Sequence, residues 1–448
     1  MQLEPRMESR PRASLGEDAQ APIAPWTGAT RIAFRFAFVY FGLCNSELAL
    51  HVLPFPPFAQ LEPLYMGLRW RLVVWVSGQL LHLSHDFSTD FQNVARASKD
   101  TTYIWVQTLC YLVIAVVATL VWSWADRKRL EYTWLHKWFL VYLRVCLAAG
   151  LISFGVVKLL PVQFAPPPPS ELARTIGSLR REQLLWVSMG VSPIYCFFGG
   201  LMEVVPAFLL LLPGVVTLGA LLSIASMTNV LMLNFGYDIG AKSMSINMLL
   251  MAVLIVLPDA ARLADFFLPN RSVPANHPRA LFRQAWLNRA ATALLVLFGV
   301  VLFNYTFFRS YQEITGRLSA ENTNLYGTWF VDDYAVSGES KPPLSTSTHR
   351  WQRLFIDSKH DAVVEVMSGD FQPLFLRIDP HAHSLVLTES GGPEWIAELM
   401  YDDSKPGSLL LRGTMGGLPV MIQLHREDQS KFPVNDHKIT WVRDANSK

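Results

Sequence analysis

The character of the chain changes near Arg309. Before this point the sequence consists of apolar runs, many of them close to the roughly 20 residues that an α-helix needs to cross a bilayer. After it, apolar and polar residues alternate over short segments separated by Gly, Pro, Asp and Ser, a pattern typical of β-strands joined by tight turns. The sequence therefore predicts a membrane α-helical bundle followed by a small antiparallel β-barrel.

Seven apolar segments are long enough to predict transmembrane helices. They are 28–53, 103–125, 138–160, 193–213, 215–235, 242–260 and 290–308. A shorter segment, 72–83, follows Arg69 and Arg71 and predicts a re-entrant or interfacial helix, with an eighth span as the alternative. We expect a flexible polar tail over 1–27, a transmembrane domain over 28–310 and a barrel domain over 320–448.

The distribution of Lys and Arg predicts the orientation of the spans. These residues concentrate in 126–137 and 261–289, two loops that share one membrane side with the N-terminus in a seven-span arrangement. We therefore expect an inner (plasma) membrane protein with a cytoplasmic N-terminus and an extracytoplasmic barrel. The net charge of only +2, without a block of basic residues, argues against a nucleic-acid partner.

Glu203 is the most informative ionisable residue in the predicted bundle. It lies about 10 residues into its span, or roughly 15 Å deep at 1.5 Å per residue. A carboxylate at that depth requires a proton, hydrogen bonds or a cationic partner. Two interpretations remain open, a polar contact that joins helices and a group that transfers a proton or contacts a ligand.

Other polar residues gather toward the same end of the predicted spans. Because long amines reach the headgroup region at little expense, each lysine alone has an ordinary explanation. Together the residues predict a polar pocket that opens to the outside beneath the barrel. We assign Lys158 and Glu203 as candidate catalytic residues, and we assign candidate ligand-binding roles to Asn229, Asn234, Tyr237, Asp238 and Lys242.

The sequence offers little support for a metal centre or a disulfide exchange site. His82 and His85 share a helical face with Asp86 nearby, but no further ligand follows at a matching spacing, so a polar face on a membrane-surface helix is favoured. The four cysteines lie in apolar runs and form no CxxC motif. We therefore predict no metal site and interpret the cysteines as buried small residues.

Three stretches of the bundle resemble the DoxX-like family of integral membrane proteins. They are GLISFGVVKLLPVQF (150–164), LLWVSMGVSPIYCFFGGLMEVVPAFLLL (184–211) and TLGALLSIASMTNVLMLNFGYDIGAKSMSINMLLMAVLIVLPDAARL (217–263). Within them, the resemblance rests on the Gly155 and Lys158 pair, the Gly200 and Glu203 pair and the segment NVLMLNFGYD. Over residues 138–263 it implies a four-helix membrane unit, and some members of the family are linked to quinone-coupled oxidation of sulfur compounds.

The C-terminal region shows the alternation expected of strands. Val420, Ile422 and Leu424 share one face, and Ile439 and Trp441 repeat the pattern. Predicted turns are 368–370, 390–393, 402–403 and 415–417. His381 and His383 are interpreted as solvated residues at a strand end. The opening Gly327-Thr328-Trp329 resembles the start of lipocalin-like barrels, which implies an interior that is either filled by side chains or holds one small apolar ligand.

Three functions remain open from the sequence. The first is a quinone- or redox-linked membrane protein that works through the outer polar pocket, with quinone as its cofactor or ligand. The second is a protein that binds an apolar molecule in the barrel or assists its transport. The third is a scaffold subunit that associates with other membrane proteins.

Overall fold

The computed structural model describes residues 26–46, 56–84, 87, 100–268, 271–273, 280–321, 323–389, 396–429, 432 and 434. Two compact units make up the chain. The first consists of Met1–His82 and Val106–Phe139, and the second of Leu83–Trp105 and Leu140–Lys448.

The first unit contains α1 (Gly28–Cys44), α3 (Pro56–Trp75), the π-helical turn η1 (Val76–Leu80), most of α5 (Thr102–Ala125) and the start of α6 (Thr133–Leu159). Buried Arg35 organises it. Its Nη2 donates to the Tyr132 hydroxyl at 2.7 Å and its Nη1 donates to Ser123 Oγ at 2.8 Å. Tyr132 in turn donates to Asp126 Oδ2 at 2.8 Å. A cation placed early in the first span is thus neutralised by a buried polar network.

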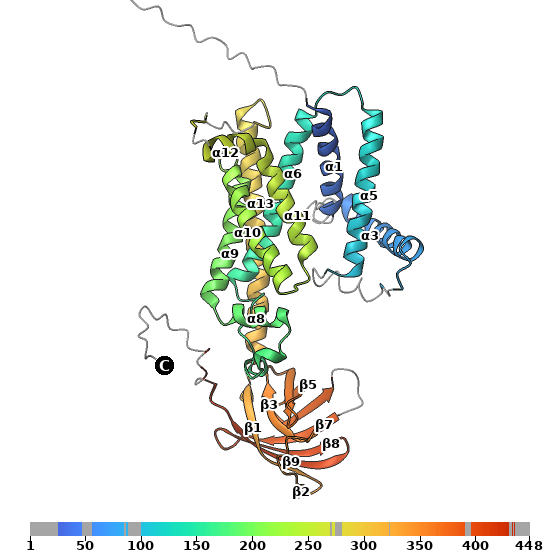
Figure 1. Cartoon of the computed structure of the whole chain (residues 1–448). Helices are drawn as coiled ribbons and strands as arrows, with labels where there is room; N and C mark the ends of the chain where they lie inside the picture. Colours follow the sequence, from blue (N-terminus) through green and yellow to red (C-terminus); the bar gives the residue numbers. More distant parts are fainter. Residues whose placement is uncertain are drawn as a thin grey trace, which may run out of the picture. The chain divides into compact units, whose positions relative to one another are not determined.

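The predicted short helix over 72–83 is the end of a longer one. Residues 56–80 are helical without interruption: the prolines at 56 and 57 lie in the first turn, where proline is tolerated, and the helix also continues through Pro63 in its interior. Polar residues of α3, including Arg69 and Arg71, lower its hydropathy, so the apolar stretch in the sequence understates the length of the helix. Figure 1 shows α3 running across α5.

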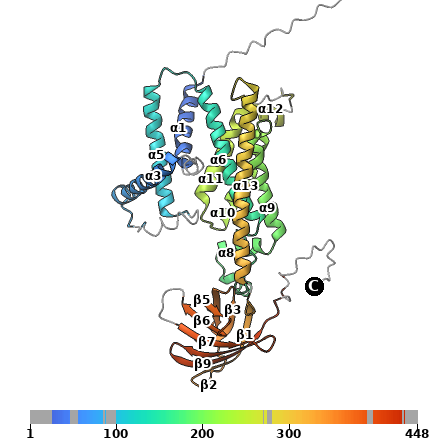
Figure 2. The ribbon, with the colours of Figure 1, turned by 180° about the vertical axis from the view of Figure 1, so that it is seen from behind.

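The second unit contains the remaining helices. They are α7 (Pro169–Leu172), η2 (Ile176–Ser178), α8 (Arg181–Gly190), α9 (Pro193–Leu211), α10 (Val216–Gly236), α11 (Lys242–Val256), η3 (Leu257–Asp259), α12 (Ala260–Phe267) and α13 (Ala285–Glu321). Helices α9, α10 and α13 run side by side in both views of the ribbon (Figures 1 and 2).

Six helices in the described part of the chain are long and apolar enough to cross a membrane. They are α5, α6, α9, α10, the continuous stretch Lys242–Phe267, and α13. Helix α1, with 17 residues, is shorter than the roughly 20 required, and the end of the predicted span 28–53 lies outside the described residues. Only 6% of the most apolar window of α13 is buried against protein. Such a surface suits a multi-pass membrane protein surrounded by lipid.

The C-terminal domain is a closed antiparallel barrel, as predicted. Its eight strands are β1 (Gly327–Val336), β3 (Trp351–Ile356), β4 (Asp361–Val366), β5 (Phe371–Asp379), β6 (Ser384–Glu389), β7 (Ile396–Asp402), β8 (Ser408–Met415) and β9 (Leu418–Arg426). Each pairs with the next, and β1 pairs with β9 to close the barrel. The two-residue β2 (Glu339–Ser340) only extends the hairpin after β1. The pairing of β1 with β9 covers the two edges that an open sheet of these eight strands would expose.

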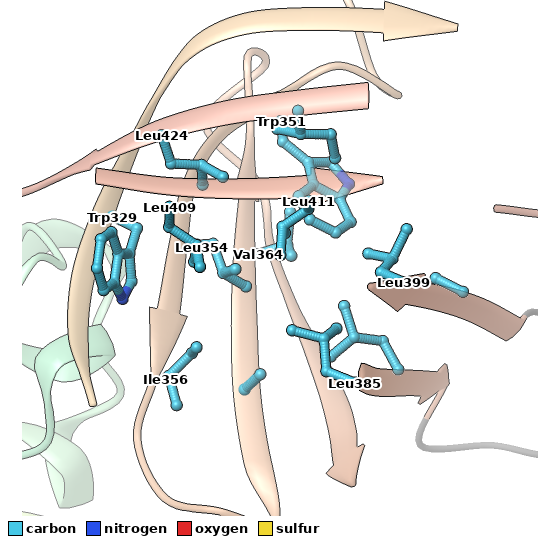
Figure 3. Packing of buried hydrophobic residues seen from close by; sticks show 14 of the residues in the cluster. Trp329, Trp351, Leu354, Ile356, Val364, Leu385, Leu399, Leu409, Leu411 and Leu424 are labelled. Atoms are coloured by element: carbon cyan, nitrogen blue, oxygen red, sulfur yellow. The ribbon is translucent and has the colours of Figure 1, made fainter. Parts of the chain in front are cut away.

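Apolar side chains fill the interior of the barrel (Figure 3). Val420, Ile422 and Leu424 are buried on the inner face of β9, which confirms the predicted alternation. Trp329 Nε1 donates to the Leu325 carbonyl at 2.8 Å, and the guanidinium of Arg426 covers the Trp329 ring at 5.8 Å. The core around Trp329 is therefore packed with side chains.

The predicted turns at 368–370 and 415–417 coincide with turns of the barrel to within one residue, whereas the predicted turn at 402–403 is too early, because Asp402 ends β7 and residues 403–407 form the connection to β8. Residues 367–369 join β4 to β5, and residues 416–417 join β8 to β9. His381 and His383 are exposed in the turn before β6. The predicted turn at 390–393, and the alternation at Ile439 and Trp441, lie outside the described residues.

Candidate functional site

Two glycines allow α6 and α9 to approach closely. A Cβ atom on Gly155 would lie 2.6 Å from Val204 Cγ2, and a Cβ atom on Gly200 would lie 2.7 Å from both the Gly155 carbonyl oxygen and the Leu159 nitrogen. Only glycine fits at such a contact between helix backbones. The two glycines of the sequence motifs therefore face each other at one helix crossing.

Lys158 and Glu203 each lie three residues beyond one of these glycines, almost one helical turn away. The crossing brings them together, and Lys158 Nζ lies 2.5 Å from Glu203 Oε1. Their side chains are only 11% and 2% exposed. The cationic partner that Glu203 required is thus Lys158, on a neighbouring helix.

Half of the Glu203 carboxylate is left without a protein partner. Its Oε2 atom is buried and accepts no hydrogen bond from the described residues. An unsatisfied buried acceptor is unfavourable by about 1–3 kcal/mol, and more when it carries charge. Groups of this kind call for an explanation, and a bound molecule is one.

A cavity of about 500 Å³ lies beside the ion pair. Its walls come from α6, α8, α9, α10, α11 and the segment after α6, and most of the lining is apolar or aromatic, including Phe154, Trp186, Met202, Leu233 and Met248. The polar lining includes Lys158, Glu203, Gln163, Glu182, Asn229 and Asn234. The Oε1 atom of Gln163 is a second buried acceptor without a partner in the described structure. The cavity therefore combines an apolar body with a few polar groups, the usual composition of a ligand site.

The cavity opens at the lateral surface of the bundle, between α9 and α10. Tyr195 and Phe198 on α9 line it and are 52% and 55% exposed. Asn229 on α10 also lines it and is exposed. Because this face is one that lipid covers in a bilayer, a molecule dissolved in the membrane has a direct route to the cavity.

The predicted site residues fall into two groups. Lys158, Glu203, Asn229 and Asn234 all line the cavity. The Asn234 amide also donates to the Ala241 carbonyl and to Ser245 Oγ, each at 3.1 Å, and so holds the turn between α10 and α11.

Tyr237, Asp238 and Lys242 lie in or beside that turn and do not line the cavity. Asp238 is exposed, in a left-handed conformation with φ 57°, and pairs with Lys242 at 3.0 Å. The hydrogen bond from Lys242 and its positive charge lower the pKa of Asp238. The backbone nitrogen of Lys242 donates to Asp100 Oδ2 at 2.7 Å. These contacts stabilise the turn between α10 and α11.

One wall of the cavity was not predicted from the sequence. Helix α8 contributes Leu185, Trp186 and Met189, which lie between the predicted spans 138–160 and 193–213. Residues 185 and 189 are four apart and both buried, which is the spacing of an amphipathic helix. That spacing, in a segment too short to span a bilayer, is the signal that would have revealed the wall.

The segment before α8 also touches the barrel. Ser170 in α7 donates from its backbone nitrogen to Asp357 Oδ1 at 3.0 Å and from its hydroxyl to Oδ2 at 2.5 Å. Arg174 covers the Phe371 ring at 4.6 Å. Burial raises the pKa of Asp357, against the effect of the Ser170 hydrogen bonds. Pro168 and Pro169 begin α7, so the proline run leads directly into this contact.

Among the described residues, the histidine, acidic and cysteine side chains form neither a metal site nor a disulfide. Within the described residues no group of three His, Cys, Asp or Glu side chains could hold a metal, and His85 and Asp86 lie outside them. All four cysteines are free thiols, and Cys110, Cys146 and Cys196 are buried.

Comparison with known proteins identifies no family. No family model matches the chain, and no solved structure matches it. The chain is similar to the uncharacterised protein YwoB of Bacillus subtilis (strain 168), with 27% identity over 124 residues, which cover 28% of this chain and 79% of that protein. This likeness carries no activity with it, so the functional argument rests on the site itself.

Proposed function

We propose that the bundle cavity binds a lipid-soluble small molecule of the quinone type and that the protein has a redox-linked role through this ligand. The observation that carries the proposal is the buried pair of Lys158 and Glu203, two residues that line an apolar cavity and whose Glu203 Oε2 atom accepts no hydrogen bond from the described residues. In this proposal Lys158 and Glu203 contact the polar ring of the ligand.

The dimensions and position of the cavity support such a ligand. Its volume of about 500 Å³ falls within the roughly 300–1,000 Å³ of small-molecule sites. A substituted ring would occupy the enclosed part near Glu203, and an isoprenoid tail would leave past Tyr195 and Phe198 into lipid. The resemblance of the Gly155 and Lys158 pair and the Gly200 and Glu203 pair to DoxX-like proteins adds support from the sequence.

The orientation of the protein belongs to the same proposal. Positive loops at 126–137 and 261–289 favour a cytoplasmic N-terminus, which places the barrel and the nearby mouth of the cavity on the extracytoplasmic side. Asn229 and Asn234 would then contribute to an outward-facing part of the site, with Tyr237, Asp238 and Lys242 in the turn behind it.

A second candidate function places an apolar ligand in the lipocalin-like barrel. The packed interior restricts it to one end, where a cavity of about 510 Å³ is lined by residues that include Tyr334, Trp351, Leu418 and the buried Arg350. The Arg350 guanidinium donates to the Lys341 and Trp351 carbonyls and has no carboxylate partner in the described structure. A positively charged, partly apolar cavity is the specific feature that favours this alternative.

One experiment separates the two candidates. The full chain would be purified in native lipid particles, and its bound lipids would be extracted and identified by mass spectrometry. Ala225→Trp obstructs the bundle cavity, and Leu418→Trp obstructs the barrel cavity, because each residue lines one of them. We expect bound quinone in the wild type, at least a tenfold loss in Ala225→Trp, and no loss in Leu418→Trp. Loss only in Leu418→Trp would favour the barrel, and equal retention in both variants would refute both sites.

A further inference from the structure

We infer that the group of the ligand that meets Lys158 and Glu203 is an uncharged hydroxyl, which accepts a hydrogen bond from the lysine and donates one to the glutamate. This inference rests on the proposed function and specifies the chemical class of the ligand. Of a quinone couple it selects the reduced, hydroquinone form.

The ion pair combines an unused hydrogen-bond donor with an unused acceptor. An ammonium group has three hydrogens, and only the bond to Glu203 Oε1 engages Lys158 within the described structure. The Glu203 Oε2 atom of the same ion pair is an acceptor without a donor. A hydroxyl both donates and accepts, so one oxygen atom can satisfy the two residues together.

Carbonyl and ether oxygens accept hydrogen bonds but cannot donate them. Such a group could bond to Lys158 but would leave Glu203 Oε2 unsatisfied in a buried position. The Oε1 atom of Gln163, which lines the same cavity, also lacks a donor. Two unsatisfied acceptors in one cavity favour a ligand that brings a hydrogen to the site.

The charges that line the cavity favour an uncharged head group. Lys158 and Glu203 carry opposite charges, so a neutral ligand leaves their buried pair intact. A carboxylate would approach both Glu203 and Glu182, which also lines the cavity, and an ammonium, although attracted to these two carboxylates, would have to lie beside the Lys158 ammonium that already bonds to Glu203. Because like charges in a poorly solvated site repel strongly, neither charged head suits it.

The test compares two redox-inert probes that differ only in the hydrogen-bond donor. The full chain in phosphatidylcholine nanodiscs would be labelled with a 4-alkylphenol that carries a diazirine in its alkyl chain, and labelled peptides would be mapped by mass spectrometry. Unlabelled 4-nonylphenol and 4-nonylanisole would compete for the site. We expect 4-nonylphenol to compete at least about tenfold better, the effect of one hydrogen bond to a charged acceptor.

Variants test whether Glu203 is the residue that distinguishes the phenol hydroxyl from the ether of the anisole. In Glu203→Gln, and in the charge-neutral Lys158→Met/Glu203→Gln variant, we expect the preference for the phenol over the anisole to fall below threefold. Glu321→Gln makes the same chemical change in an ion pair with Arg317, at 3.7 Å, away from the cavity, and should leave the preference unchanged.

The outcomes separate this inference from the function on which it rests. Equal competition by phenol and anisole, or an undiminished preference in both Glu203 variants, would overturn the hydroxyl assignment while leaving a ligand site in the bundle. Stronger competition by decylamine or decanoate than by the phenol would also overturn it. If no probe labelled peptides from α6, α9, α10 or α11, the proposed function itself would fail.

Discussion

The barrel and the helical bundle distribute polar and apolar side chains in opposite ways. In the barrel the interior is apolar, and on β9 the outward residues include Gln423 and His425. In the bundle, large apolar side chains such as Leu201 and Val205 of α9 point outward, whereas Glu203, Ser226 and Asn234 are buried. The same physical rule, that a surface resembles its solvent, gives both patterns if water surrounds the barrel and lipid surrounds the bundle.

This contrast indicates where each domain can support chemistry. A filled apolar barrel interior stabilises the domain, and a cavity lies at one of its ends. In the bundle, polar groups are withdrawn from lipid into the protein, and Lys158 and Glu203 must satisfy each other there. A buried polar pair beside a cavity is therefore the more informative feature of the two domains.

The largest expected effect comes from breaking the buried ion pair. Glu203→Gln leaves the Lys158 ammonium without a counter-charge, and removing one partner of a buried pair typically destabilises by about 3–5 kcal/mol. Unfolding of the full chain in mixed micelles, followed by SDS titration, would measure the loss. The double variant Lys158→Met/Glu203→Gln should recover most of it.

The matched comparison is an ion pair on the barrel. Lys341 lies 2.9 Å from Glu339, with side chains 47% and 78% exposed. Water and salt screen such a pair, so Lys341→Met should leave the unfolding midpoint almost unchanged. Equal losses from the two pairs would mean that Lys158 and Glu203 are solvated and that the proposed burial of the site is wrong.

The next effect tests the exposed faces directly. Val205 on α9 is 48% exposed and Met421 on β9 is 41% exposed, so the two side chains differ mainly in the solvent that we assign to them. Val205→Asp should disfavour membrane insertion by about 2.5–3.5 kcal/mol. Met421→Asp should change stability by no more than about 0.5 kcal/mol. A membrane-insertion assay and a thermal melt would give the two values. If Val205→Asp did not reduce insertion, the face of α9 that carries Val205 would not be in contact with lipid.

The sequence predicted those properties that follow from the hydropathy of a segment and from the spacing of its apolar residues. Alternation at Val420, Ile422 and Leu424 identified the inner face of β9, because a strand places every second side chain on one side. The depth of Glu203 in an apolar run required a partner, and Lys158 supplies it from a helix 45 residues earlier. Neither argument needed knowledge of how the helices pack.

What escaped prediction depends on packing in three dimensions. Asp238 and Lys242 are close in sequence to Asn234, yet they bond to each other and, from the Lys242 backbone, to Asp100, and they do not line the cavity. Tyr237 packs against the buried cluster that includes Phe164 and Leu185 without lining the cavity itself. Trp186 lines the cavity from α8, a helix that is too short to be recognised as a transmembrane span from its hydropathy. The hydropathy of a segment indicates whether lipid or water surrounds it. It does not indicate the angle at which the segment crosses neighbouring helices.

The smallest of the expected effects concerns the helix crossing that brings the ion pair together. Gly199 and Gly200 are adjacent, but a Cβ atom on Gly199 would meet nothing within 4 Å, whereas one on Gly200 would meet backbone atoms of α6. Gly200→Ala should therefore destabilise by about 1–3 kcal/mol through overpacking. Gly199→Ala should be neutral or stabilise by up to about 1 kcal/mol, because alanine favours the helix. Melts of both variants in nanodiscs would give the difference. If the two alanines behaved alike, α6 and α9 would not be in contact at this point, and the pairing of Lys158 with Glu203 would lose its structural basis.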